Sequence, residues 1–147
     1  MRLRTRILLI LELLLGVLPV SVFYIYHFPV GLFWTRSVLE LAIEGTVNLF
    51  TTCIAVFFVV GGLGLACLCY AMFARLSGRG FPNRLVLAGV VLGMAASLGL
   101  LMISWITAGF WIDYYIYGAP LIVGAHQLYS GLRQKTRRLK APAPAVP

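Results

Sequence analysis

The sequence predicts an all-α integral membrane protein built as a bundle of four transmembrane helices. The chain has 147 residues, of which 61% are hydrophobic and 11% are charged, and its mean hydropathy is +0.97. This composition is too apolar for a water-soluble domain, and the chain is too short for more than one domain. A spanning helix needs about 20 apolar residues. The stretches that qualify are residues 7–26, 47–73, 85–107 and 111–132.

The basic residues predict how these helices are oriented. Of the 12 Lys and Arg residues, all but Arg36 lie in three clusters beside the apolar stretches. The clusters are Arg2, Arg4 and Arg6; Arg75, Arg79 and Arg84; and Arg133, Lys135, Arg137, Arg138 and Lys140. Cytoplasmic loops carry such an excess of positive charge, and four crossings put all three clusters on one side. We therefore expect a multi-pass protein of the cell inner (plasma) membrane, N-in and C-in, with both termini cytoplasmic.

The first stretch, residues 7–26, is expected to remain in the protein as a transmembrane helix. It follows three arginines, as the apolar part of a secretory signal peptide does, but it contains Glu12 and lacks the small-residue cleavage site of such a peptide. Pro29 and Gly31 then predict a break, and a helical pattern resumes near Trp34. The charged face of this next piece consists of Arg36, Glu40 and Glu44 at i, i+4 spacing. It is predicted to be a short amphipathic helix along the outer membrane interface.

The later stretches are expected to form hairpins. A turn-rich segment, residues 74–83, separates the second stretch from the third on the inner side. A short connection around Gly109 makes the last two helices antiparallel neighbours. Residues 1–140 are thus predicted to form one transmembrane domain, and the Pro-rich tail, 141–147, to be disordered.

Glu12 is the acidic residue placed inside a predicted span, where an ionisable group is costly and marks a candidate functional position. At 1.5 Å per residue it lies about 9 Å beyond Arg6, while His126 lies about 10 Å inside Arg133, so the two share one depth. We expect Glu12 to face the bundle and to hydrogen-bond His126 or Gln127. The contact serves either as a structural clamp or as a site for protons or ions.

Gly89 and Gly93 form a G-x-x-x-G pattern in the third stretch. Small residues at this spacing let helix backbones approach closely in lipid. They are expected either to close the protein's own bundle or to bind a transmembrane segment of a partner.

The residues give no support to catalysis, and we expect neither an enzyme nor a bound cofactor or metal. His27 and His126 lie about 20 Å apart in depth, so one haem cannot use both. Cys67 and Cys69 form C-x-C within a helix, which is neither a redox C-x-x-C pair nor a good metal site. Nucleic acid is not an expected partner, because the basic residues lie beside apolar stretches.

Binding within the bilayer is therefore the predicted activity, with lipid and a second protein as partners. We expect a small immunity protein that neutralises a membrane-active or pore-forming bacterial toxin by helix-to-helix contact. The outer residues expected to assist are Trp34, Arg36, Glu40, Glu44 and Asp113. The alternatives are a small ion or solute transporter or channel subunit that uses Glu12, assembled as a homo-oligomer, and an accessory subunit of a membrane complex.

Overall fold

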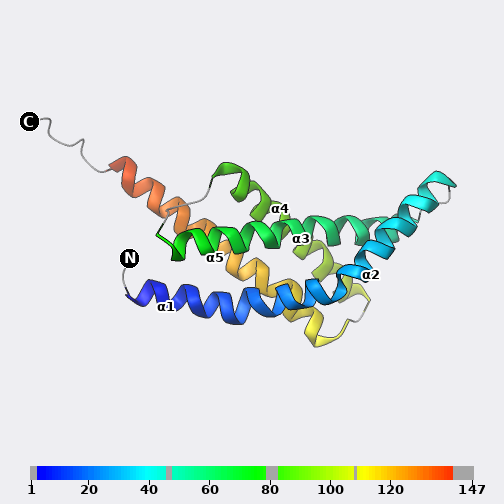
Figure 1. The fold of residues 1–147 in the computed structure, drawn as a ribbon, viewed down its shortest axis with the longest axis horizontal. Coiled ribbons are helices and arrows are strands. Elements are labelled where there is room, and N and C mark those ends of the chain that lie inside the picture. Colours follow the sequence, from blue (N-terminus) through cyan, green and yellow to red (C-terminus); the bar gives the residue numbers. More distant parts are fainter. Residues whose placement is uncertain (1–2, 46–47, 79–82, 108, 141–147) are drawn as a thin grey trace, which may run out of the picture.

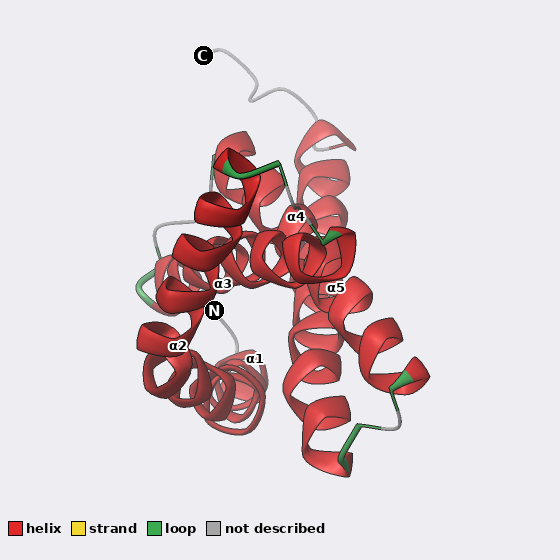
Figure 2. Ribbon diagram, turned by 90° about the vertical axis from the view of Figure 1, so that its right-hand side faces the viewer, coloured by secondary structure: helices red, strands yellow, loops and turns green. Residues whose placement is uncertain are grey.

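The computed structural model describes residues 3–45, 48–78, 83–107 and 109–140, and these ranges are helical apart from short turns, with no strand (Figures 1 and 2). The first helical stretch is continuous from Leu3 to Ile43. It comprises α1 (Leu3–Leu11), a π-helical segment η1 (Glu12–Val17) and α2 (Leu18–Ile43). Three more helices follow: α3 (Leu49–Leu76), α4 (Arg84–Ile106) and α5 (Trp111–Lys140).

Three helical stretches are long and apolar enough to cross a membrane, namely Leu3–Ile43, Leu49–Leu76 and Arg84–Ile106, each with a mean hydropathy of 2.4 over its most apolar part. Large apolar side chains such as Ile25, Leu63 and Trp105 are exposed along them. In water such exposure would be costly, whereas lipid solvates these side chains without penalty. The chain is therefore a helical membrane protein. The predicted fourth span, 111–132, falls in α5, which is not among these three.

The ends of the helices gather at two ends of the molecule. Figure 1 shows that α1 begins, α3 ends, α4 begins and α5 ends toward the left, whereas the α2–α3 and α4–α5 connections lie toward the right. We call the first the basic end, because Arg4, Arg6, Arg75 and Arg84 all lie within a few residues of these helix ends. The other is the turn end.

Capping residues explain where α2 and α3 stop and start. Gly45 and Gly78 follow the last residues of α2 and α3 and have φ of 73°, a left-handed conformation that glycine adopts without strain. The side chain of Asn48 accepts a hydrogen bond of 2.9 Å from the backbone N–H of Phe50 and so caps the start of α3. These caps define where α2 ends and where α3 begins and ends.

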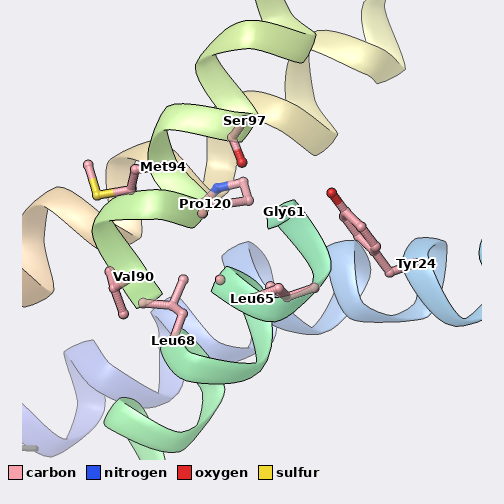
Figure 3. A pocket seen from close by; sticks show the side chains of 10 residues that line it. Tyr24, Gly61, Leu65, Leu68, Val90, Met94, Ser97 and Pro120 are labelled. Atoms are coloured by element: carbon pink, nitrogen blue, oxygen red, sulfur yellow. The ribbon is translucent and has the colours of Figure 1, made fainter. Parts of the chain in front are cut away.

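The core lies where η1, α2, α3, α4 and α5 converge. Its buried apolar side chains are Val17, Val20, Leu65, Leu68, Met72, Val90, Ile116 and Val123. Figure 3 shows the middle of this junction, where the Tyr24 hydroxyl is directed toward Gly61 and Pro120 approaches from α5. The remaining cavity here is about 10 Å³, no larger than one water molecule needs. The junction is closed.

One sequence prediction about the first helix is wrong. Pro29 and Gly31 do not end it, because α2 runs through both to Ile43 and no separate interfacial helix follows. A proline inside a helix removes one backbone hydrogen bond, whereas a break in an apolar environment leaves several groups unsatisfied. The hydroxyl of Thr35 also donates to the Gly31 carbonyl at 2.8 Å. Trp34, Arg36 and Glu40 thus lie on the same continuous helix as Glu12, and Glu44 is its C-terminal cap.

The other boundaries differ from the prediction in length. α3 continues three residues past 73, and α5 continues eight residues past 132. Residues 46–47, the middle of the inner loop at 79–82 and the tail 141–147 lie outside the described residues, as do the side chains of Trp34 and residues 134–140.

Candidate functional site

A buried polar cluster joins three helical segments near the basic end. The amide nitrogen of Gln127 donates a hydrogen bond of 2.8 Å to Oε2 of Glu12, and Nδ1 of His126 contacts Oε1 of the same carboxylate. From α3, Arg75 donates to Oε1 of Gln127 and, at 3.2 Å, to the hydroxyl of Ser130. Gln127 is 2% exposed and Arg75 is 8% exposed. We call these five residues the polar cluster.

The contact that the sequence predicts for Glu12 is confirmed, and the carboxylate engages His126 and Gln127 together. Whether these residues bind anything else stays a prediction. The sequence reasoning missed Arg75, which it counted among the charges of the loop after α3. The turn residues Ser77 and Gly78 were the available signal, because they place Arg75 inside the last turn of the helix and not in the loop.

The local backbone explains how Glu12 reaches its partners. Glu12 is the first residue of η1, where Leu18 N–H bonds the carbonyl of Leu13, five residues earlier. Pro19 follows in the first turn of α2 and has no N–H for the usual bond four residues back. The π-helical turn, in which residues five apart are hydrogen-bonded, accommodates the missing N–H of Pro19. Such turns often occur at functional positions.

The cluster balances opposite charges inside the bundle. Arg75 and Glu12 interact electrostatically, and the amide of Gln127 lies between them, with its oxygen toward the guanidinium and its nitrogen toward the carboxylate. A buried charge without such partners would be heavily penalised in a membrane protein. The arrangement therefore ties η1, α3 and α5 together as a clamp.

A large apolar concavity lies elsewhere, between α2 and α3. It measures about 550 Å³ and opens at the molecular surface. Its lining residues are Ser21, Tyr24, Ile25, Phe28, Gly31, Leu32, Thr35, Phe58, Val59, Gly62, Leu63, Leu65, Ala66 and Cys69. We call this the α2–α3 groove. The hydroxyls of Ser21 and Thr35 bond their own helix backbone, so the groove presents a largely apolar surface.

A small-residue pattern lies on the α3 wall of the groove. Gly62 and Ala66 are spaced i, i+4, Ala66 is exposed, and a Cβ at Gly62 would meet Tyr24 at an ordinary 3.6 Å. Closely approaching helices in lipid use such pairs. The neighbouring Gly61 and Gly64 are buried in the protein's own core, against Tyr24 and against the backbone of Gly93.

Gly89 and Gly93 lie in the contact between α3 and α4. A Cβ at Gly93 would come within 2.5 Å of the Gly64 Cα, and a Cβ at Gly89 within 2.4 Å of the Cys67 sulfur. The two backbones therefore touch at Gly64 and Gly93. Of the two roles expected for this pattern, the structure places both glycines in internal packing, and we do not assign them to a partner.

The outer residues expected to bind a partner lie apart from the polar cluster, at the turn end. Arg36 and Glu40 form an exposed i, i+4 ion pair of 2.7 Å, of the kind that adds little stability. Glu44 caps the end of α2 through its backbone. Asp113 accepts a hydrogen bond of 3.0 Å from the backbone N–H of Phe110 and so caps the start of α5. The side chain of Trp34 lies outside the described residues.

The remaining histidine and the thiols have local contacts. Nδ1 of His27 hydrogen-bonds the Phe23 carbonyl at 2.9 Å, and its ring stacks on the Phe23 ring. Cys69 lies 3.8 Å from the Ser21 hydroxyl, and all three cysteines are free thiols. In the part of the chain that the structure describes, no three His, Cys, Asp or Glu residues are grouped to hold a metal ion.

No protein-family model matches the chain, and the comparisons with curated proteins and with solved structures found no match. Function therefore has to be inferred from the groove and the polar cluster themselves.

Proposed function

We propose that this protein binds a transmembrane segment of another protein in the α2–α3 groove, and that it acts as an immunity protein against a membrane-active or pore-forming toxin. The groove is the observation that supports this function. It is large, apolar and open on a protein whose central junction is closed. A helix with apolar side chains is the kind of partner that such a groove accepts.

The groove has the surface that helix binding in lipid requires. Apolar side chains alone do not drive helices together there, because lipid tails solvate them equally well, so close packing on small residues supplies the attraction. Gly62 and Ala66 offer this packing on α3. An inserted toxin helix held here would be separated from the other copies that it needs to form a pore. Such neutralisation requires binding and no turnover.

We further propose that α5 crosses the membrane as a fourth helix, so that both termini are cytoplasmic in the inner (plasma) membrane. Its two ends lie at opposite ends of the molecule (Figure 1). Its polar residue Gln127 is buried against Glu12 and Arg75, which lowers the cost of placing it in lipid. The basic residues at one end favour the cytoplasmic side for that end.

A matched pair of substitutions tests the groove. Ala66→Leu fills the groove, whereas Ala95→Leu makes the same change at an exposed position of α4 outside it. Cells that express the protein together with a membrane toxin encoded beside its gene should survive with the wild type and with A95L. Survival should fall at least tenfold with A66L at equal membrane levels of protein. Equal protection by A66L and A95L would remove the groove from the mechanism.

Direct binding is measured with a photo-crosslinking amino acid at position 66 and, as the control, at position 95. Under the proposal, position 66 crosslinks to the toxin and position 95 does not. Crosslinks to a constant set of other membrane proteins would instead identify an accessory subunit. Crosslinks to a second copy of the chain would identify a homo-oligomer, the assembly expected of the transport alternative.

A further inference from the structure

We propose that a second cavity, between α2, α3 and α5, binds a six-membered ring that carries a hydroxyl group. The ligand hydroxyl donates to Nε2 of His27 and accepts from the hydroxyl of Tyr117. The cavity measures about 170 Å³, and its walls include Phe23, His27 and Val30 of α2, Ile54 and Phe58 of α3, and Tyr117 of α5. We call it the ring cavity. The proposal does not depend on toxin binding in the α2–α3 groove.

The local contacts of His27 determine which ring nitrogen is available to a ligand. Nδ1 lies 2.9 Å from the carbonyl oxygen of Phe23, and because a carbonyl oxygen only accepts, Nδ1 carries the hydrogen of this bond. In the neutral ring Nε2 is then an acceptor, and it has no hydrogen-bond partner among the described residues. Stacking on Phe23, with 4.0 Å between ring centroids, and an edge contact with Tyr26 hold the imidazole in place. The ring cavity therefore has a fixed acceptor on α2.

Tyr117 brings a hydroxyl to the same cavity from α5. It also has no hydrogen-bond partner in the part of the chain that the structure describes. Unpaired polar groups are costly in an apolar environment. A ligand hydroxyl can satisfy both residues at once, because it has one hydrogen to donate to His27 and lone pairs to accept from Tyr117. A cavity of this volume is about one ring across, so a ring that fills it lies against both side chains.

The volume and the aromatic walls favour a ring over other occupants. A cavity of about 150 Å³ holds benzene, and the ring cavity is slightly larger. Phe23, Phe58 and Tyr117 offer aromatic surfaces on which a flat ring packs well. Water fits poorly, because about five molecules would be needed to fill the space and each requires at least two polar partners. Most of the wall is apolar and cannot supply them.

Phe58 forms the boundary between the ring cavity and the α2–α3 groove. Its side chain lines both, and it stacks on Tyr24 with 5.1 Å between ring centroids. The absence of a side chain at Gly31 makes room for it, since a Cβ there would lie 2.0 Å from the Phe58 ring. A ligand ring in the cavity can therefore carry an apolar tail past Phe58 into the groove.

Nuclear magnetic resonance of histidine ring nitrogens tests the site with two probes of similar shape, phenol and toluene. The full chain, labelled with ¹⁵N-histidine, is placed in nanodiscs of phosphatidylcholine, and both probes are compared at equal concentrations in the bilayer. His27→Gln identifies the His27 signals by their disappearance. We expect phenol to shift the Nε2 signal of His27 saturably, and toluene, which has no hydrogen to donate, to shift it by less than half as much. The signals of His126, which does not line the cavity, should stay in place.

A matched pair of variants tests the second hydrogen bond. Tyr117→Phe should weaken phenol binding about fivefold, the worth of one hydrogen bond. It should leave toluene binding, measured by competition with phenol, unchanged, whereas a loss of structure would weaken both probes. Tyr129→Phe makes the same change at an exposed position of α5 and should bind phenol as the wild type does.

Two results would overturn the proposal. One is a wild-type protein in which phenol and toluene shift the His27 signal equally, or in which phenol shifts His126 as much as His27. Either would show partition into the bilayer without a site, and neither can be attributed to a misfolded variant. The other is equal phenol affinity of Y117F and Y129F, because the hydroxyl of Tyr117 would then take no part in binding.

A further comparison identifies the source of the ligand, which is either a free phenol or the head group of a quinol lipid. Decylhydroquinone has the same ring chemistry and carries an apolar tail. Ala66→Leu, which fills the groove and does not line the ring cavity, should weaken binding of decylhydroquinone alone if the natural ligand is a quinol lipid. Unchanged binding of both decylhydroquinone and phenol by A66L would identify a free phenol.

Discussion

The hydroxyl of Tyr115 on α5 donates a hydrogen bond to the backbone carbonyl of Leu15 in η1. In an α-helix that carbonyl would receive the N–H of residue 19, but residue 19 is Pro and has none. A side chain that is 100 positions away in the sequence therefore supplies a donor at the point where the first helix is defective. The bond fixes α5 against η1.

Loss of this bond should be measurable and should depend on Pro19. Tyr115→Phe is expected to lower the free energy of unfolding by about 0.5–1 kcal/mol, the usual worth of one hydrogen bond between helices. The cost should shrink in a Pro19→Ala background, because residue 19 then has an N–H for the Leu15 carbonyl. Reversible unfolding in mixed micelles, followed by circular dichroism, measures both steps of the cycle. Equal costs in the two backgrounds would mean that Tyr115 does not compensate for the proline.

The contact between α3 and α4 predicts a strong difference between two glycines. Gly93→Ala should destabilise the protein by about 2 kcal/mol, since the new methyl group would lie 2.5 Å from the Gly64 Cα, which is backbone and cannot turn aside. Gly118→Ala is the control, because a Cβ there meets nothing within 4 Å and alanine favours helix. The same unfolding assay compares them. A Gly93→Ala protein as stable as Gly118→Ala would exclude the close approach of the two backbones.

The polar cluster predicts that Gln127 stabilises the fold. Gln127→Leu removes the acceptor of Arg75 and the donor to Glu12, which leaves two buried charges with fewer partners. We expect a loss of about 2–3 kcal/mol in the free energy of unfolding. Ala125→Leu, at an exposed position of the same helix, should be close to neutral. If both substitutions had the same small effect, the cluster would not act as a clamp.

Cysteine labelling tests the proposed orientation and the fourth crossing. After the native cysteines are replaced by Ser, Ile43→Cys and Trp111→Cys place exposed thiols at the turn end, while Ser77→Cys and Arg133→Cys place them at the basic end. A membrane-impermeant maleimide should label the first pair in intact cells and the second pair only after permeabilisation. If Trp111→Cys and Arg133→Cys were labelled from the same side, α5 would not cross the membrane.

Much of the helical fold could be predicted from apolar length, because lipid leaves the chain few alternatives to helix. The wrong prediction of a helix end at Pro29 has the same physical cause, the lack of water to satisfy free backbone groups. In a water-soluble protein, proline followed by glycine marks a helix end, since water satisfies the freed carbonyls. In an apolar environment the continuous helix is the cheaper state, and α2 continues to Ile43.

The polar cluster could be predicted in part. Depth along a helix is a linear function of residue number, so Glu12 and His126 could be matched by counting from Arg6 and Arg133. The direction in which a side chain points around the helix axis cannot be counted in the same way, because the π-helical segment from Glu12 to Val17 has a different number of residues per turn from an α-helix. The α2–α3 groove could not be predicted, because it depends on how α2 and α3 pack against each other around Gly31 and Phe58, and no local pattern encodes that packing.

The uninterrupted helix from Leu3 to Ile43 has a mechanical consequence. Its 41 residues span about 60 Å, roughly twice the thickness of the hydrocarbon layer. No loop interrupts α2, so a displacement of Arg36 and Glu40 at the turn end can be passed along the helix to Glu12 near the basic end. A change at one end of the molecule can thus be transmitted to the other through a single helix.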